Sequence, residues 1–178
     1  MTISGTNFST TPGQDQVSVN GTAATVTAAT ATQLTVTVPS GATSGHLTVT
    51  TPGGAVTSTQ DFFVPPAGYS TAQVSLTTRT TLGSTPSASF TSANTIGLLV
   101  FDAAAGQRLS VEASNVTIGG SGCCSTVLSL LKPDGSALVG GAYVGTAGGF
   151  VDTVTAAAAG TYTLVVVPQN GATGSLSL

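Results

Sequence analysis

Charge is what this sequence lacks most. It has 3 Lys or Arg and 6 Asp or Glu in 178 residues, so 5% of it is charged, whereas an ordinary soluble domain carries about 25%. Three scattered basic residues cannot neutralise a phosphate backbone, so the composition excludes nucleic acid as a natural partner. Helix-forming Glu, Lys and Arg are nearly missing as well, which argues against a helical protein.

Groups that carry out catalysis are also scarce. The chain has one histidine, His46, and no Asp or Glu stands close to it in the sequence. Catalysis needs a nucleophile near a base, paired carboxylates or a metal cluster, and a zinc site needs at least three protein ligands. We therefore expect no enzymatic activity and no resident cofactor, and we interpret His46 as a surface or interface residue.

Long apolar runs are absent too. The mean hydropathy is +0.40, but Thr, Ser, Gln and Gly interrupt every segment before it reaches the roughly 20 apolar residues that a spanning helix needs. We expect no membrane insertion. The first 20 residues lack the basic start and apolar centre of a secretory signal, so we expect that the signal was removed or that this is a piece of a longer extracellular or cell-surface protein.

Hydroxyl-bearing and small residues take the place of charge. The chain has 33 Thr, 20 Ser, 23 Gly and 23 Ala. Apolar and polar residues alternate with the period of two that is typical of half-buried strands, most clearly where Leu34, Val36 and Val38 share one face. The alternation predicts strands at 17–19, 33–38, 46–50, 73–76, 108–112 and 175–178. The sequence thus indicates an all-β protein.

Three longer apolar runs predict central strands buried on both faces, at 96–101, 127–131 and 164–167. The alanine runs 103–105 and 156–159 are too short for helices and each ends at a glycine, so we interpret them as turns. Pro65-Pro66-Ala67-Gly68 predicts a stiff linker, because prolines end strand pairing. We therefore expect domains at residues 1–64 and 69–178, joined by the linker 65–68.

The first half resembles the IPT/TIG family of immunoglobulin-like domains. The resemblance covers residues 3–64 and rests on five segments in order, which are 3–8 (I-S-G-T-N-F), 17–24, 34–39, 45–49 and 63–64. It implies an immunoglobulin-like β-sandwich. Family members begin with a strand and a turn before the I-x-G segment, so we expect this sandwich to lack its usual first strand.

The second half looks like a bacterial pre-peptidase C-terminal domain, which implies a jelly-roll-like β-sandwich. This resemblance rests on residues 97–111, on 127–135 with its Pro-Asp-Gly turn, and on 152–154 leading to 159–166. Both families occur as non-catalytic accessory modules of large extracellular bacterial proteins. The resemblance therefore predicts two tandem sandwiches without a catalytic domain.

Cys123 and Cys124 are adjacent and lie between glycines and Ser125. Neighbouring strand residues point to opposite faces, so the two thiols cannot fill one core. In an oxidising compartment an even cysteine count favours a disulfide. We predict a vicinal disulfide, with two reduced cysteines or bonds to another subunit as the alternatives.

Other candidate sites have simpler explanations. Asp102, Asp134 and Asp152 are the carboxylates that calcium could use in the second half, but they form no Asp-x-Asp run, and turn or edge roles explain them better. Carbohydrate binding would use exposed aromatics such as Tyr69, Tyr143 and Phe150, whereas Tyr162 stands where an inward strand or corner tyrosine would. Glycosylation sequons begin at Asn7, Asn20 and Asn115, and we assign them no role.

Unprotected sheet edges carry the functional hypothesis. Native proteins blunt such edges with charge, especially Lys, and this chain has a single Lys, in a turn. Without a first strand, an edge would be exposed along Ile3, Ser4, Gly5, Thr6, Asn7 and Phe8, and a neighbour's strand could complete it. We hypothesise a building block of an extracellular fibre or stalk, a homo-oligomer or one module among neighbouring domains of a longer chain. The alternative is an adhesin or accessory module that binds a glycan or a protein.

Overall fold

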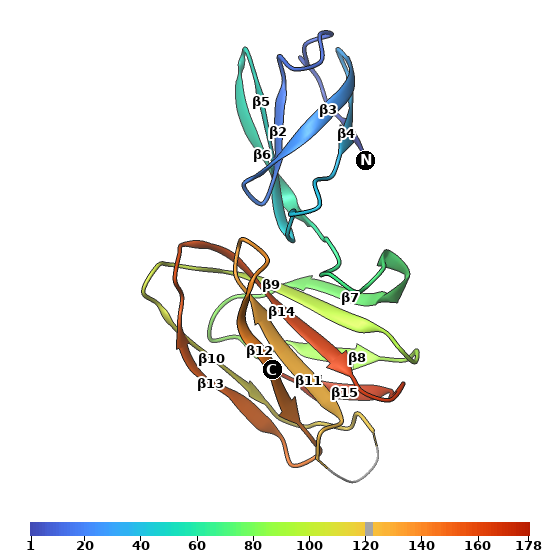
Figure 1. Cartoon of the computed structure of the whole chain (residues 1–178), viewed down its shortest axis with the longest axis vertical. Coiled ribbons are helices and arrows are strands. Elements are labelled where there is room, and N and C mark those ends of the chain that lie inside the picture. The colour runs from blue at the N-terminus through green and yellow to red at the C-terminus, as the bar shows by residue number, and fades with distance from the viewer. Residues whose placement is uncertain (120–122) are drawn as a thin grey trace. The chain divides into compact units, whose positions relative to one another are not determined.

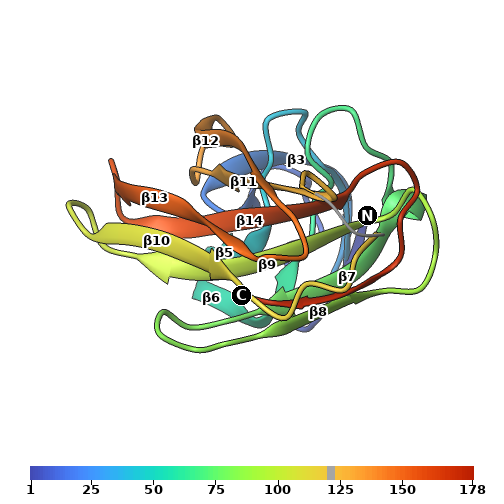
Figure 2. The same cartoon turned by 90° about the horizontal axis from the view of Figure 1, so that it is seen from below.

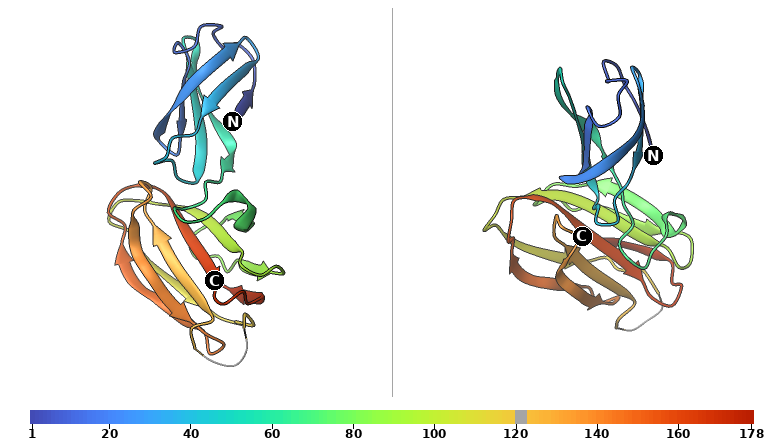
Figure 3. Two further views of the ribbon diagram at one scale, coloured as in Figure 1. Left: turned by 45° about the vertical axis from the view of Figure 1, so that its right-hand side comes forward. Right: turned by 45° about the horizontal axis from the view of Figure 1, so that its top comes forward.

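The computed structural model describes residues 1–119 and 123–178 and divides the chain into two compact units, Met1–Val64 and Pro65–Leu178. Strands form both units (Figure 1). The helical structure among the described residues is a single 3₁₀ turn, η1 (Thr71–Gln73), visible as the dark green coil in the left view of Figure 3. The all-β prediction is confirmed, and no helix in the described part of the chain could cross a membrane.

The first unit is built from six strands that follow one another in the order β1-β4-β3-β2-β5-β6. All the pairings are antiparallel. Strand β3 pairs with β2 through its first residues and with β4 through the rest, so it connects the two parts of the sandwich. The strands are β1 (Thr2–Ser4), β2 (Gln16–Val19), β3 (Thr22–Thr30), β4 (Gln33–Thr37), β5 (Gly45–Thr51) and β6 (Gly54–Phe62).

The core of the first unit follows from the period of two. Leu34 and Val36 of β4 are buried, while the residues between them are exposed. They pack with Val17 and Val49 of neighbouring strands. The predicted alternation of β4 is confirmed, and it directs every apolar side chain of this strand to one face.

The N-terminal segment forms an edge that is shorter than predicted. Strand β1 pairs with β4, and the amino group of Met1 donates to the carbonyl of Val36 at 2.7 Å. After Ser4 the chain leaves the strand, and the amides of Gly5 and Phe8 donate to carbonyls of the β3–β4 turn. Ile3 and Ser4 therefore lie in an edge strand, whereas Gly5, Thr6, Asn7 and Phe8 do not.

The second unit is a two-layered sandwich. One layer is a five-stranded sheet with the order β12-β11-β14-β9-β7, and the other consists of the pairs β10-β13 and β15-β8. Figure 2 shows the chain end after β15 beside β8, its partner. The strands are β7 (Val74–Arg79), β8 (Ser87–Phe90), β9 (Ile96–Ala103), β10 (Arg108–Ala113), β11 (Thr126–Leu131), β12 (Ala137–Val144), β13 (Gly149–Thr155), β14 (Gly160–Pro168) and β15 (Gly174–Ser177).

The core of the second unit lies between the two layers. Phe101 of β9 and Tyr162 of β14 stack with ring centroids 6.0 Å apart, and both belong to a buried cluster that includes Leu128 and Leu176. Strands β9 and β14 carry continuous buried runs, as predicted. Strand β11 differs, because its outward residues are only half-buried and its pattern alternates.

Asparagine marks the places where the chain reverses. All five asparagines have positive φ, from 44° to 62°, in the left-handed region that asparagine tolerates better than other non-glycine residues. They are Asn7, Asn20, Asn94, Asn115 and Asn170. The three predicted sequons thus begin at turn residues. The alanine runs form no helix: residues 104–105 and 156–159 connect strands as expected, whereas Ala103 is the last residue of β9.

Candidate functional site

The second layer of the C-terminal sandwich is split, and the split creates a pocket. Its two strand pairs are joined where Ser114 and Ser177 exchange backbone hydrogen bonds of 2.9 and 2.8 Å. On the Arg108 side of this bridge, β10 has β13 as its partner. The layer therefore opens there, and part of the core between the layers is left uncovered.

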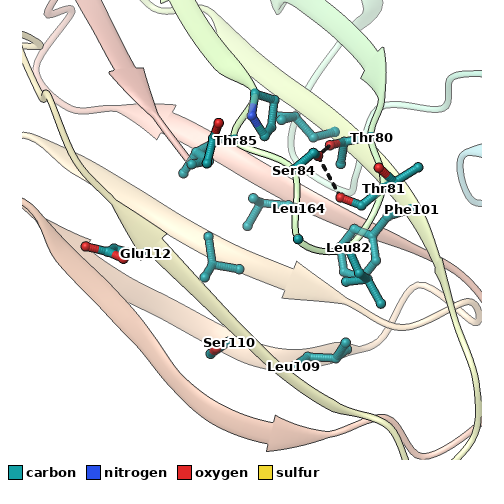
Figure 4. A pocket seen from close by; sticks show the side chains of 15 residues that line it. Thr80, Thr81, Leu82, Ser84, Thr85, Phe101, Leu109, Ser110, Glu112 and Leu164 are labelled. Carbon is teal, nitrogen blue, oxygen red and sulfur yellow. Dashed lines mark hydrogen bonds between the residues drawn. The ribbon is translucent and has the colours of Figure 1, made fainter.

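The opening is a pocket of about 300 Å³ with an apolar floor (Figure 4). Leu99 and Phe101 of β9 and Leu164 of β14 form the floor from the large sheet, while Leu109 and Val111 of β10 form one wall. Strand alternation explains the arrangement, since these residues point inward between the layers. The pocket suits an apolar group.

The opposite rim is the loop between β7 and β8, residues 80–86. The hydroxyls of Thr80 and Ser84 are 2.6 Å apart, and Ser84 also donates to the carbonyl of Thr81 at 2.6 Å (Figure 4). Gly83 takes the positive φ of 82° that the turn requires. Leu82 lines the pocket although its side chain is 45% exposed. The loop thus presents an apolar tip held by hydroxyl groups.

Glu112 is the one ionisable residue that lines this pocket. It also borders two further hollows of about 280 and 260 Å³. One of them, of about 280 Å³, contains Asp152 and Phe150 of β13. Phe150 is 66% exposed, so an aromatic ring and two carboxylates share this hollow.

The carboxylates considered for calcium do not come together. Asp102 accepts hydrogen bonds of 2.7 Å from Arg79 and from Thr161, Asp134 lies in the turn between β11 and β12, and Asp152 lies on β13 in the other layer. Within residues 1–119 and 123–178, no three His, Cys, Asp or Glu side chains gather into a metal-binding group. The three aspartates therefore do not form a common ligand set.

Asp134 has a structural role in its turn. Its Oδ1 accepts hydrogen bonds from the backbone amide and the hydroxyl of Ser136, at 2.9 and 2.6 Å. These hydrogen bonds, helped by the positive charge of Lys132, hold the pKa of Asp134 below its ordinary value. The ionised side chain closes the Pro-Asp-Gly turn.

His46 has an acidic neighbour that the sequence did not reveal. It is paired across the strands with Asp61 of β6, and Nδ1 of His46 lies 3.7 Å from Oδ1 of Asp61. This distance allows electrostatic attraction but is too long for a hydrogen bond. The sequence offers no acid close to His46, so a carboxylate partner had to come from elsewhere in the chain. The pairing of β5 with β6 supplies Asp61, which is 15 positions away.

The two cysteines touch each other. Both are exposed and free, and the Cys124 thiol donates to the sulfur of Cys123 at 2.8 Å. This hydrogen bond raises the pKa of Cys124 and thus favours the less reactive thiol form. With φ of 71°, Cys124 is also the one described residue other than glycine and asparagine in the left-handed region. The vicinal disulfide stays a prediction, which intact mass after alkylation without reductant will test.

The three tyrosines divide into one buried ring and two that are at least partly accessible. Tyr162 is fully buried, and its hydroxyl donates to the carbonyl of Ala158 at 2.8 Å, in agreement with the predicted inward or corner position. Tyr143 on β12 is 65% exposed. Tyr69 borders a hollow of about 210 Å³ with Pro66 and outward residues of β11 and β14.

Comparison with known proteins identifies the first unit. The model of the IPT/TIG domain family matches residues 1–64, so the predicted identity of this domain is confirmed. A solved structure, the pre-peptidase C-terminal domain of collagenase from Bacillus anthracis, is similar with 15% identity and a TM-score of 0.40. The match covers 57% of this chain and 90% of that one. No curated protein matches.

Proposed function

We propose that the chain is a non-enzymatic structural module of a larger secreted or cell-surface bacterial protein, and that neighbouring molecules pair through their sheet edges to form an extracellular fibre or stalk. The observation that carries this proposal is the composition of the sheet edges. Strand β12, at one edge of the five-stranded sheet, runs for eight residues without a charge. Such an edge presents unpaired backbone groups that another strand can bind.

Strand β6 supports the same proposal in the first unit. It is an edge strand of nine residues in which Asp61 is the one charge. Its pairing with β5 is regular from Gly54 to Thr57 and then shifts by a bulge. Val56, in the regular part, is 63% exposed. A partner strand would therefore find four regularly paired residues with an apolar side chain among them.

Charged substitutions on the edges test the proposal. Gly140 in β12 has no positive φ, and no atom lies within 4 Å of an added Cβ, so Gly140→Lys adds a charge without a clash. Gly140→Ser is the matched uncharged control. We expect wild type and Gly140→Ser to assemble into fibres in sedimentation and electron microscopy, and Gly140→Lys to form no species larger than pairs joined through β6, with an unchanged melting temperature. A wild-type chain that stays monomeric at high concentration without fibres would refute the proposal.

A second candidate function is ligand binding by the outer face of β10 and β13. Exposed Phe150 beside Glu112 and Asp152 combines a stacking ring with carboxylates that accept hydrogen bonds from hydroxyl groups. That set would suit an adhesin or an accessory module that binds a glycan. Titration against a glycan array, with Phe150→Ala as the negative control, distinguishes this function from assembly.

A further inference from the structure

Two Asn-Gly pairs lie in turns of the same kind. They are Asn20-Gly21, between β2 and β3, and Asn170-Gly171, between β14 and β15. The φ angles are 44° and 81° in the first pair and 55° and 68° in the second. Positive φ at both central residues is the mark of a type I′ turn. The two pairs share sequence and turn type, so a difference in their reactivity has to come from their surroundings.

An Asn-Gly pair carries both groups of an intramolecular reaction. The backbone nitrogen of the glycine attacks Cγ of the asparagine, a C–N bond forms, and the proton of the glycine N–H passes to the side-chain nitrogen, which leaves as ammonia. The five-membered succinimide then takes up one water molecule and opens to aspartate or to isoaspartate, in which the chain continues through the side-chain carbonyl. Glycine favours the attack because it has no Cβ beside its nitrogen. The side-chain amide must be able to rotate onto that nitrogen.

The side chain of Asn20 is fixed in a position that opposes this reaction. Its Nδ2 donates to the hydroxyl of Thr43 at 2.8 Å. Its Cγ, the atom that would be attacked, lies so close to Gly45 that a Cβ added there would be 2.7 Å away. The residue is half-buried. Rotation of the amide onto the nitrogen of Gly21 would break the hydrogen bond and the packing together.

The side chain of Asn170 has no such restraint. It is exposed, and within residues 1–119 and 123–178 no hydrogen bond or ion pair holds its amide. The contacts that fix this turn belong to its flanks. The amide of Gln169 donates to the carbonyl of Ser125 at 2.8 Å, and the amide of Ala172 donates to the carbonyl of Gln169 at 2.9 Å. The flanks are thus anchored while the side chain remains able to reach the nitrogen of Gly171.

We infer that Asn170 is a site of spontaneous modification, where the exposed Asn-Gly turn converts to aspartate and isoaspartate, and that Thr43 and Gly45 protect Asn20 from the same reaction. The product adds a carboxylate to a chain whose net charge is -3. This carboxylate follows Gln169, which lines a hollow of about 210 Å³ without a charged lining residue. The modification therefore brings charge to an uncharged part of the surface. The inference does not depend on the proposed function.

Incubation of the chain in mildly alkaline buffer, followed by peptide mapping with mass spectrometry, measures both sites in one sample. We expect Asn170 to convert at least about tenfold faster than Asn20, which corresponds to a barrier lower by about 1.4 kcal/mol. Methyl transfer from S-adenosylmethionine by an isoaspartate methyltransferase identifies the isoaspartate. In urea, where both turns are lost, the two sites should convert at similar rates. Equal rates in the folded chain, or an Asn170 that stays intact there but converts in urea, would overturn the inference.

Two variants separate the reactive site from the protected one. Thr43→Val removes the hydroxyl that accepts from Asn20 and should speed conversion at Asn20 about fivefold, the factor that one net hydrogen bond is worth, while Asn170 stays unchanged. Asn170→Gly keeps the left-handed corner and should abolish conversion in this turn while Asn20 stays unchanged. Melting temperatures confirm that both variants are folded. Conversion that persists in the Asn170→Gly peptide would refute the site, and an unaltered rate at Asn20 in Thr43→Val would refute the protection.

Discussion

Tyr162 shows how much a single buried polar group can matter in this chain. Its ring packs in the core and its hydroxyl is hydrogen bonded to Ala158. We expect Tyr162→Phe to lower the free energy of unfolding by about 1 kcal/mol, because the hydrogen bond from the buried hydroxyl to the carbonyl of Ala158 is lost. Tyr143→Phe, at an exposed position, should cost less than about 0.5 kcal/mol. Urea unfolding of both variants measures the difference, and equal losses would contradict it.

Asp134 provides a pH-dependent contribution at the same scale. Its pKa in the folded chain lies below the ordinary value because Ser136 donates to the carboxylate. A depressed pKa means that the ionised form stabilises the fold above the unfolded-state pKa of about 3.9, and that this contribution is lost as the pH falls through the folded-state pKa.

Ser136→Ala removes the hydroxyl donor and should therefore move the pKa of Asp134 up towards its ordinary value. A carboxyl NMR titration of wild type and variant measures both midpoints. The stability advantage of wild type over Ser136→Ala should shrink as the pH falls below about 4. Identical midpoints would show that the hydroxyl does not act on the carboxylate.

Among the elements, β15 depends on a close approach that only glycine permits. Gly174 has φ of 137°, and an added Cβ would lie 2.6 Å from the carbonyl oxygen of Thr117. Gly54, at the start of β6, has nearly the same φ of 140° but nothing within 4 Å. The two positions therefore separate backbone strain from steric clash.

We expect Gly54→Ala to cost about 1–3 kcal/mol from conformation alone. Gly174→Ala should cost more, because the backbone of Thr117 must also move and the hydrogen bonds between residues 117 and 175 are lost. Unfolding curves of the two variants of the 178-residue chain provide the comparison. Equal losses of stability would contradict this prediction, because they would mean that the backbone at Thr117 moves aside without an energetic penalty.

The elements also show what sequence reasoning can reach. Strand β4 was predictable because it buries one face, so its apolar and polar residues alternate. Strand β9 was predictable because it is buried on both faces, so nearly all of its residues are apolar. Strand β12 was not predicted, since Gly140 and Gly141 resemble a turn, yet an edge strand with an irregular register accommodates them. The pairing of His46 with Asp61 and the pocket depend on register and on the split layer, which no local pattern contains.

For the whole molecule, scarcity of charge governs association. With a net charge of -3, long-range repulsion is weak, and edge pairing uses backbone hydrogen bonds that salt screens little. We expect assembly to change little between about 20 and 500 mM NaCl and to become fastest near the isoelectric point of about 4.5. Light scattering over both series measures this, and a steep salt dependence would indicate association by charge instead.

The left-handed asparagines bear on how this chain can be altered. All five asparagines adopt the left-handed backbone conformation at turns, as many of the glycines do. Exchanging one of them for glycine preserves the handedness of the bend, whereas a β-branched replacement opposes it. A redesign of the loops in either sandwich should therefore keep these five positions as asparagine or glycine.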